Sequence, residues 1–368
     1  YREGVEVLRA PLAADVPPLS QKEYPLPFTV PETEGEYSVI VSFALAQDTL
    51  WAKKGYEVAF GQGVFGRFAP PALPAKAPEA VRGTLNWGAY GAGFNVIFSK
   101  HFRGLVSYRW AGRELLKSIP LPNFWRAPTE NDAGNAMACR YGQWKLASMY
   151  VSPHEGSEFS AVLPRYEVQP DAVCVTYTYT LATNPCAECT LRWRALGDGT
   201  LEGTLHYDPV PGLSEMPEFG VMFQMDADFD RLQWYGLGEA ETYADRKKGA
   251  KLGIFETTAQ ASMAKYLVPQ ECGNRADTRW ARVTDENGRG LALWAPKPFN
   301  VSLLPYTPHE LENAKHPFEL PEVHYSVVRL SLAQMGVGGD DTWGARTHPE
   351  FLLPADQPLE FTFFLKGL

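Results

Sequence analysis

The sequence lacks the features that mark several large classes of protein. No apolar run approaches the roughly 18 residues needed to cross a bilayer, so we expect no membrane-spanning helix. The 34 lysines and arginines do not offset the 43 acidic residues, and the net charge of −9 disfavours nucleic acid or an anionic membrane as a partner. Paired histidines of the H-x-x-x-H or H-E-x-x-H kind, a Walker loop, a Rossmann fingerprint and a G-x-S-x-G elbow are all missing. We therefore expect no metal or cofactor in this chain.

Cysteines are few and odd in number: Cys139, Cys174, Cys186, Cys189 and Cys272. This favours a reducing compartment over a disulfide framework. Cys186 and Cys189 form a C-x-x-C, but no second pair or nearby histidine completes a zinc site, and no βαβ pattern supports a redox motif. We interpret the spacing as a structural coincidence.

The chain begins at Tyr1, and no charged segment followed by an apolar one stands there. We therefore expect the chain to be a piece of a longer protein.

Alternating apolar and polar residues are the dominant pattern. Segments rich in β-branched and aromatic residues lie between clusters of Gly, Pro, Asn and Asp, which is typical of strands and turns. The clearest segments are 37–45, 94–98, 175–181, 190–196, 291–294 and 361–365. Helical spacing is found best in 130–150, where a short helix or an irregular loop is expected. The sequence predicts an all-β chain built of sandwiches.

Residues 66–82 (GRFAPPALPAKAPEAVR) carry four prolines among small residues, which predicts an extended linker. The 65 residues before the linker are short for a complete sandwich of roughly 100 residues. The β pattern after the linker is continuous. We predict a partial small sandwich over 1–65, the linker over 66–82, and one large β domain over 83–368.

The segment 125–132 (WRAPTEND) places Arg126 close to Glu130 and Asp132. Two interpretations remain open for it. The favoured one is a buried Arg–carboxylate network that fixes a long loop, because charged groups near a tryptophan are usually paired. The other is a site for vicinal sugar hydroxyls, which Arg, Asn and Asp bind well.

The segment 234–246 (WYGLGEAETYADR) has two glycines followed by Glu239, Glu241 and Asp245. Two residues apart on a strand, Glu239 and Glu241 would share a face, and glycosidases need carboxylates about 5–5.5 Å or 6.5–9.5 Å apart. Acidic residues in such a loop are more often solvated or paired, here with Arg246 or Lys247. We do not favour a catalytic pair.

The segment 335–343 (MGVGGDDTW) combines a glycine-rich turn, two aspartates and Trp343. An exposed indole there could stack on the C–H face of a pyranose, and a buried one could close the core of the last hairpin. The sequence does not decide between them.

Four segments, in order, resemble the small-chain domain of glycoside hydrolase family 2 β-galactosidases. The run 124–134 (FWRAPTENDAG) resembles the start of that domain, and 235–255 is similar to its G-x-G-x-x-E-x-Y-x-D-R signature. The segment 268–280 is similar to P-x-E-x-G-x-R-x-x-x-R-W, and 335–343 to M-G-x-G-G-D-x-S-W. The matching motif residues are Trp125, Arg126, Asn131, Asp132, Gly236, Gly238, Glu241, Tyr243, Asp245 and Arg246, which the resemblance implies to be scaffold.

The resemblance also implies an architecture. The run 49–62 resembles the end of the preceding immunoglobulin-like domain, so residues 1–65 are expected to be its C-terminal part. Residues 83–368 are expected to form a galactose-mutarotase-like β-sandwich. The implied parent is a cytoplasmic bacterial enzyme that hydrolyses terminal β-galactosides with retention. The resemblance implies that its two catalytic glutamates and its Mg²⁺ belong to a (β/α)₈ barrel that this chain does not contain. Na⁺ is a second candidate cation on that barrel.

Two features carry over by position. Trp343 matches the tryptophan that reaches into the active site of the barrel, and Thr342 replaces a frequent serine beside it. The segment from Gly134 to about Tyr141, beginning Gly134–Asn135–Ala136, matches a mobile loop at the mouth of that site. The expected partners are the barrel and N-terminal domains, in the same chain or in a large subunit, and the β-galactoside.

Two alternatives remain open. A free-standing mutarotase-like epimerase needs a general acid and base, for which His324 is the nearest candidate. A carbohydrate-binding or assembly module would need no catalytic residue at all.

Overall fold

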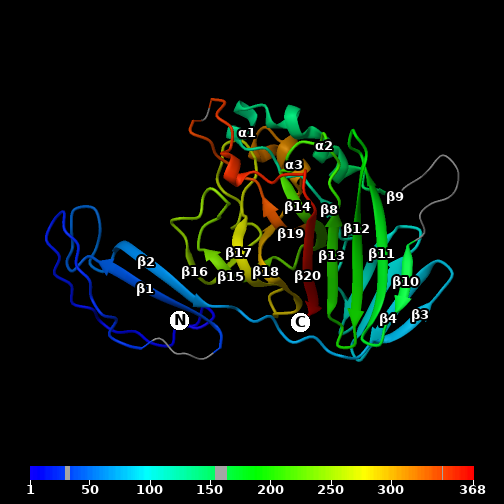
Figure 1. Ribbon diagram of the computed structural model, residues 1–368, viewed down its shortest axis with the longest axis horizontal. Coiled ribbons are helices and arrows are strands. Elements are labelled where there is room, and N and C mark those ends of the chain that lie inside the picture. Colours follow the sequence, from blue (N-terminus) through cyan, green and yellow to red (C-terminus); the bar gives the residue numbers. More distant parts are fainter. Residues whose placement is uncertain (30–33, 154–163, 342) are drawn as a thin grey trace. The chain divides into compact units, whose positions relative to one another are not determined.

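The structure, a computed structural model, describes residues 1–29, 34–153, 164–341 and 343–368 (Figure 1). The chain divides into two compact units. The first comprises residues 1–69 with 251–254, and the second comprises residues 70–250 with 255–368. No helix among these residues is long and apolar enough to cross a membrane.

The first unit is built on one hairpin. Strands β1 (Glu36–Ala44) and β2 (Glu57–Gly66) pair antiparallel, with a register shift at Phe43/Ala44. The expected strand over 37–45 is therefore confirmed in all but its last residue.

The second unit contains a small meander and a large sheet. The meander runs β3 (Glu79–Arg82), β4 (Asn86–Gly91), β5 (Phe94–Ser99), β6 (Gly104–Trp110) and β7 (Arg113–Glu114), each strand pairing with the next. Residues 79–82, the last four of the expected linker, are thus a strand, because they find hydrogen-bond partners in 87–90.

The large sheet has 13 strands within the described residues, and its main path is β10-β11-β12-β13-β20-β18-β17-β15-β16. Its strands are β8 (Leu121–Asn123), β9 (Ser152–Pro153), β10 (Arg165–Val168), β11 (Ala172–Leu181), β12 (Ala187–Leu196), β13 (Leu201–Tyr207), β14 (Glu218–Asp226), β15 (Arg231–Gly238), β16 (Lys251–Thr258), β17 (Arg275–Thr284), β18 (Gly290–Leu304), β19 (Tyr325–Gln334) and β20 (Leu359–Gly367). Strand β20 is the last along the chain, yet it lies between β13 and β18. The expectation of an all-β chain is confirmed.

Strict alternation explains how the sheet forms its core. In β13, Leu201, Leu205 and Tyr207 are buried, while the intervening side chains are only partly covered. Gly203 occupies the remaining inward position because a Cβ there would lie 2.4 Å from the ring of Phe363 on β20. Gly203 therefore leaves room for the Phe363 ring of β20 to lie over β13.

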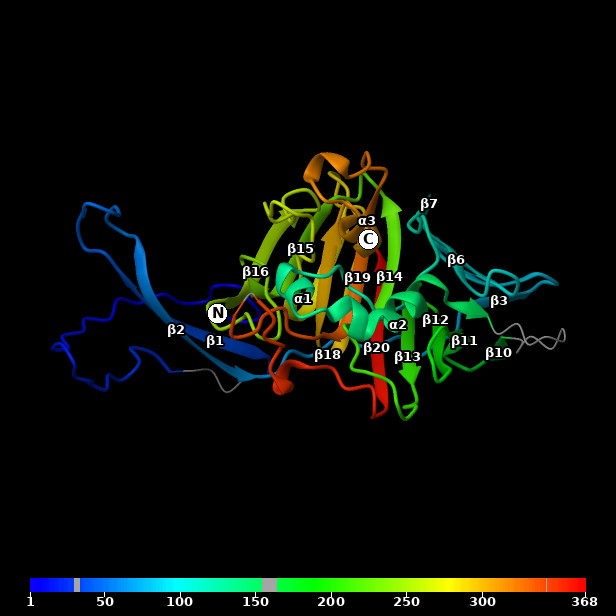
Figure 2. The same ribbon diagram turned by 90° about the horizontal axis from the view of Figure 1, so that it is seen from above.

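Helices lie across one end of the large sheet (Figures 1 and 2). They are α1 (Glu130–Gly134), α2 (Met137–Met149), α3 (Pro308–Asn313) and the 3₁₀ turns η1 (Pro317–Glu319) and η2 (Pro349–Phe351). Over 130–150, where a short helix or an irregular loop was expected, the structure has two helices. The expected loop from Gly134 to Tyr141 is wrong beyond Ala136, because Met137, Tyr141 and Trp144 are buried at helical spacing on α2.

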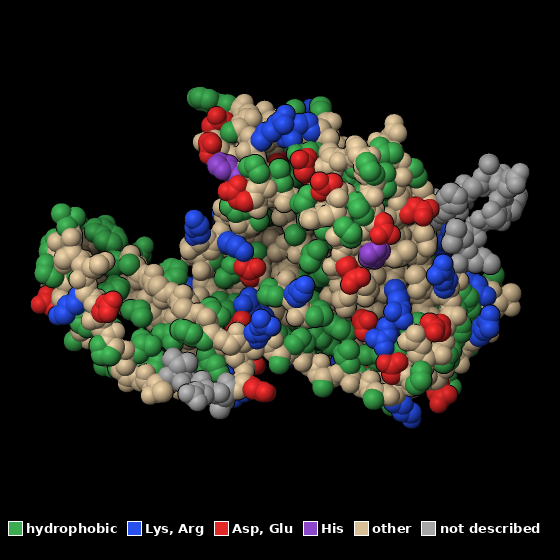
Figure 3. Space-filling view, viewed as in Figure 1, with side chains coloured by type: hydrophobic (Ala, Val, Ile, Leu, Met, Phe, Trp, Pro, Cys, Tyr) green, Lys and Arg blue, Asp and Glu red, His purple; other side chains and the backbone are tan. Residues whose placement is uncertain are grey.

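The face of the larger unit seen in Figure 3 shows Lys and Arg interspersed with Asp and Glu. No single-sign patch covers that face.

Replacing Trp144 with alanine should lower the free energy of unfolding by about 3–5 kcal/mol. The indole is fully buried, lies tilted against the Phe124 ring at 5.6 Å between centroids, and donates from Nε1 to the Ser214 carbonyl at 3.1 Å. Urea unfolding followed by circular dichroism measures the loss. Leu146→Ala on the same helix, where the side chain is 47% exposed, is the control and should cost less than about 0.5 kcal/mol. Equal losses in the two variants would contradict this packing.

Candidate functional site

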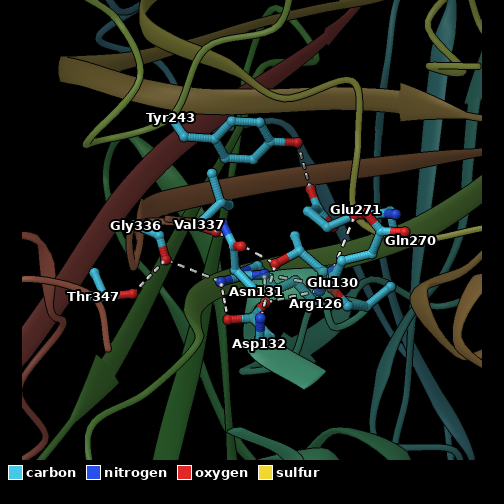
Figure 4. Close-up of polar contacts among 12 residues, drawn as sticks. Arg126, Glu130, Asn131, Asp132, Tyr243, Gln270, Glu271, Gly336, Val337 and Thr347 are labelled. Carbon is cyan, nitrogen blue, oxygen red and sulfur yellow. Dashed lines mark hydrogen bonds and ion pairs between the residues drawn. The ribbon is translucent and has the colours of Figure 1, made fainter. Parts of the chain in front are cut away.

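The segment after β8 forms a buried ion pair. Arg126 is fully buried, and its Nη1 donates to Asp132 Oδ2 at 2.5 Å (Figure 4). Asp132 also completes a capping box at the start of α1. Its carboxylate accepts from Thr129 N at 2.9 Å, and the backbone N–H of Asp132 donates to Thr129 Oγ1. Both side chains of the pair are thus engaged and enclosed. Neither is exposed to a sugar.

The same ion pair fixes a distant loop. Arg126 Nη2 donates to the Gly336 carbonyl at 3.1 Å, and Asn131 Nδ2 donates to the Val337 carbonyl at 3.2 Å. From another segment, Asp245 Oδ2 accepts from Gly338 N at 2.8 Å. A Cβ on Gly336 would lie only 2.6 Å from that Asp245 oxygen. Three segments therefore meet at one place: 125–132, the segment at Asp245, and 336–338. The glycine at 336 permits the close approach of Asp245.

A buried chain of charges extends from this place into the sheet. Arg329 on β19 donates to Glu271 Oε1 at 2.5 Å and to Glu218 Oε2 at 3.2 Å, and the Tyr243 hydroxyl donates to Glu271 at 3.4 Å. Burial opposes the charge on Arg329, but the two carboxylates raise its pKa. Burial also raises the pKa of the Tyr243 hydroxyl and, against the influence of Arg329, that of Glu218.

Glu239 and Glu241 have different environments. Glu241 accepts hydrogen bonds from Arg246 Nη2 at 2.6 Å, the Tyr266 hydroxyl at 2.8 Å and Gly273 N at 2.7 Å. Glu239 is exposed. A carboxylate held by three donors is not a free nucleophile, so this geometry gives no support to a catalytic pair.

Gly236 and Gly238 of the same segment have a packing role. A Cβ on Gly236 would lie 2.8 Å from Thr278 Oγ1, and one on Gly238 would lie 2.7 Å from the Phe255 ring. The two glycines let β15 pass close to its neighbours.

Trp343 lies at the surface, with 89% of its side chain exposed. It belongs to a loop of residues 336–347, here called the Trp343 loop, of which Thr342 lies outside the described residues. Asp341 Oδ1 accepts from the backbone N–H groups of Trp343, Gly344 and Ala345 at 2.8, 3.2 and 3.1 Å. These bonds lower the pKa of Asp341 and fix the backbone that carries the indole. In this chain the indole does not close a core.

The Gly134–Ala136 segment lies beside the Trp343 loop. Asn135 Nδ2 donates to the Ala345 carbonyl at 3.5 Å, and Arg140 Nη2 donates to Asn135 Oδ1 at 2.5 Å. Ala136 has φ 56°, a left-handed conformation that costs an L-residue about 1–2 kcal/mol. This strained joint separates α1 from α2 at the point nearest the loop.

The remaining candidates stay apart. His324 is exposed immediately before β19, Cys186 is exposed and Cys189 is buried. Among the described residues, no three His, Cys, Asp or Glu side chains are grouped to hold a metal ion. The pairing of Glu218, Glu271 and Arg329 was not foreseen. The signal in the sequence is one arginine within the otherwise uncharged strand segment 326–332 (SVVRLSL).

Comparison with known proteins gives two family matches. Residues 90–365 match the family described as Beta galactosidase small chain, and residues 1–65 match Beta-galactosidase, domain 4. A beta-galactosidase from Halalkalibacterium halodurans is 40% identical over 99% of this chain and 36% of its own length. A beta-galactosidase small subunit from Latilactobacillus sakei is 33% identical over 78% of this chain and 97% of its own length.

The chain spans about a third of the length of most of the curated relatives it matches. Among solved structures, a putative aldose 1-epimerase from Escherichia coli K12 aligns with a TM-score of 0.39 at 12% identity. That alignment covers 77% of this chain and 98% of the epimerase chain.

Asp132→Asn should destabilise the larger unit by about 3–5 kcal/mol, because it leaves the Arg126 guanidinium buried without a counter-charge. Urea unfolding monitored by tryptophan fluorescence measures the change. Asp340→Asn is the matched control: this carboxylate is exposed beside His348, and its loss should change stability by less than about 1 kcal/mol. Wild-type stability in Asp132→Asn would mean that the pair does not fix the loop.

Proposed function

Because this chain belongs to the β-galactosidase small-chain family, we propose that it is the non-catalytic C-terminal region of a β-galactosidase. In this proposal the Trp343 loop completes the sugar-binding site of the parent enzyme. The hydrolysis of terminal β-galactosides is carried out by other domains of that enzyme.

The observation that carries the proposal is the exposed indole of Trp343 on a fixed backbone. A side chain that is 89% exposed gains nothing from the core, whereas its loop is held by Asp341, Arg126, Asn131 and Asp245. Pre-organisation of this kind lowers the entropic cost of binding. A flat indole can then stack on the apolar face of a pyranose ring.

The acidic residues of this chain support a catalytic role elsewhere. Retaining hydrolysis requires two carboxyl groups about 5–5.5 Å apart, one as nucleophile and one as acid and base. Glu241 is held by three donors, and Glu218 and Glu271 are buried against Arg329. We assign the hydrolytic pair to a (β/α)₈ barrel, either in the same chain or in a separate large subunit. The Latilactobacillus sakei relative, which is named a small subunit, gives a precedent for the second arrangement.

The divalent cation belongs with that barrel in this proposal. The described residues offer no group of three His, Cys, Asp or Glu side chains for a metal ion, and no step is assigned to a metal here. The segment Gly134–Asn135–Ala136 contacts the Trp343 loop and would border the mouth of the completed site.

The isolated chain should not hydrolyse o-nitrophenyl-β-galactoside, because the proposal assigns the hydrolytic carboxylate pair to another domain. Release of o-nitrophenol from the purified 368-residue chain is compared with a buffer blank. Turnover well above the blank would overturn the assignment of catalysis to other domains. Galactose anomerisation by the same sample, followed by polarimetry against a Trp343→Ala control, would decide for a mutarotase if it exceeded the rate of that control and of buffer.

In the parent enzyme, Trp343→Ala should weaken substrate affinity by roughly 1–3 kcal/mol, the scale for losing an aromatic contact. The expected signature is a rise in KM of about 5- to 150-fold. Steady-state kinetics on the full-length enzyme or the reconstituted subunits provides the test. Trp51→Ala serves as the control, since Trp51 is also exposed but lies in the first unit, and it should leave KM unchanged. Unchanged KM and kcat in Trp343→Ala would remove the indole from the site.

A further inference from the structure

A polar pocket lies beside β16 and β17 and is lined in part by the segments that follow β15 and β16. Its volume is about 640 Å³. Its charged lining residues are Glu239, Glu241, Glu256, Arg246, Lys265 and Arg275. Nothing in the proposed sugar site uses this pocket.

Arg275 is the unusual member of this lining. Its side chain is only 4% exposed and its guanidinium lies over the Trp234 ring, 4.8 Å from the centroid. Nη1 donates to the adjacent Asn274 carbonyl at 3.2 Å, and Nε has no partner. No carboxylate among the described residues forms an ion pair with it. Burial lowers the pKa of Arg275, and the nearby charge of Glu241 offsets this only in part.

The neighbouring carboxylates do not neutralise Arg275 directly. Among the nearby charges, Glu241 has the largest effect on the pKa of Arg275. The Glu241 oxygens, however, accept hydrogen bonds from Arg246, Tyr266 and Gly273. Glu239 and Glu256 are exposed, and Glu256 accepts from Gln233.

Two further polar groups of the lining could favour an anion against the exposed carboxylates of Glu239 and Glu256. Ser262, which also lines it, has a buried hydroxyl without a partner. Lys265 is exposed and belongs to no ion pair formed by the described residues. The pocket thus combines a buried guanidinium, an unused hydroxyl and a free ammonium group.

We propose that this pocket binds a carboxylate group, with Arg275 as the residue that pairs with it and Lys265 as a second cation at the rim. Guanidinium is well matched to carboxylate geometry, and its pairing gains strength where water is excluded. The carboxylate can come from a small organic acid or from an acidic side chain in the rest of the parent enzyme. The inference does not depend on the role proposed for Trp343.

The test uses malonate as the probe and the full 368-residue chain. Thermal unfolding is measured across a malonate titration, with sodium chloride holding the ionic strength constant. The wild type should show a saturable rise in Tm. Arg275→Met should abolish that rise and, without malonate, be at least as stable as the wild type, because it removes a buried charge that forms no ion pair.

Arg282→Met is the matched control. Arg282 lies on the same strand, and its guanidinium also lies over a ring, that of Trp280, but it is exposed and outside the pocket. It should retain the full malonate response. No rise in the wild type, or an equal rise in Arg275→Met, would overturn the proposal.

Lys265→Met keeps the test decisive if Arg275→Met fails to fold, since an exposed rim residue is dispensable for folding. Losing its charge should raise the half-saturating malonate concentration about two- to fivefold. An unchanged half-saturation would contradict the site.

The two sources of the carboxylate are separated by repeating the titration on the assembled parent enzyme. If an acidic side chain of the parent fills the pocket, malonate no longer raises Tm and Arg275→Met weakens assembly. If the natural occupant is a free organic acid, the malonate response persists.

Discussion

The ion pair between Arg126 and Asp132 is the contact on which the functional end of the larger unit depends. One guanidinium joins the N-terminal cap of α1 to the backbone of Gly336, and neither partner is exposed. A buried pair of this kind adds little net stability relative to apolar packing, because desolvation offsets most of the attraction. What it contributes is geometry. Separating the two partners would leave an unpaired charge in the interior. Positions of the loop that separate them are therefore strongly disfavoured.

The second buried system, Glu218–Arg329–Glu271 with Tyr243, extends the same principle across the sheet. Its charges alternate in sign, and Asn123 and Gln334 donate further hydrogen bonds to Glu218. The result links β8, β14 and β19 to the segment around Glu271 through side chains as well as backbone. The end of the sheet that faces the helices is therefore tied by polar contacts, whereas the middle is packed by aromatic rings such as Trp193 against Phe363.

Local patterns explain which parts of this structure could be predicted. The alternation in 175–181 and 190–196 predicts β11 and β12 because a half-buried strand imprints a period of two on its own sequence. The turn chemistry of Gly338, Gly339 and Asp341 likewise predicts a tight loop before Trp343. The pairing of Arg329 with Glu271 and Glu218 could not be predicted, because the partners are 58 and 111 residues away and share no local pattern. The exposure of Trp343 was also undecided, because a tryptophan after a turn has the same sequence context in a core and at a surface.

The position of β20 has a consequence for how the chain acquires its fold during synthesis. This strand is made last among those described, yet it fills the gap between β13 and β18 in the middle of the large sheet. Until residues 359–367 leave the ribosome, β13 and residues 291–294 of β18 lack this common partner, and closure must wait for contacts of very high sequence separation. A nascent chain therefore presents two open strand edges at once, a state prone to aggregation. Slow, late closure of this sheet, rather than any weakness in the finished core, is the step at which chaperones would matter for this protein.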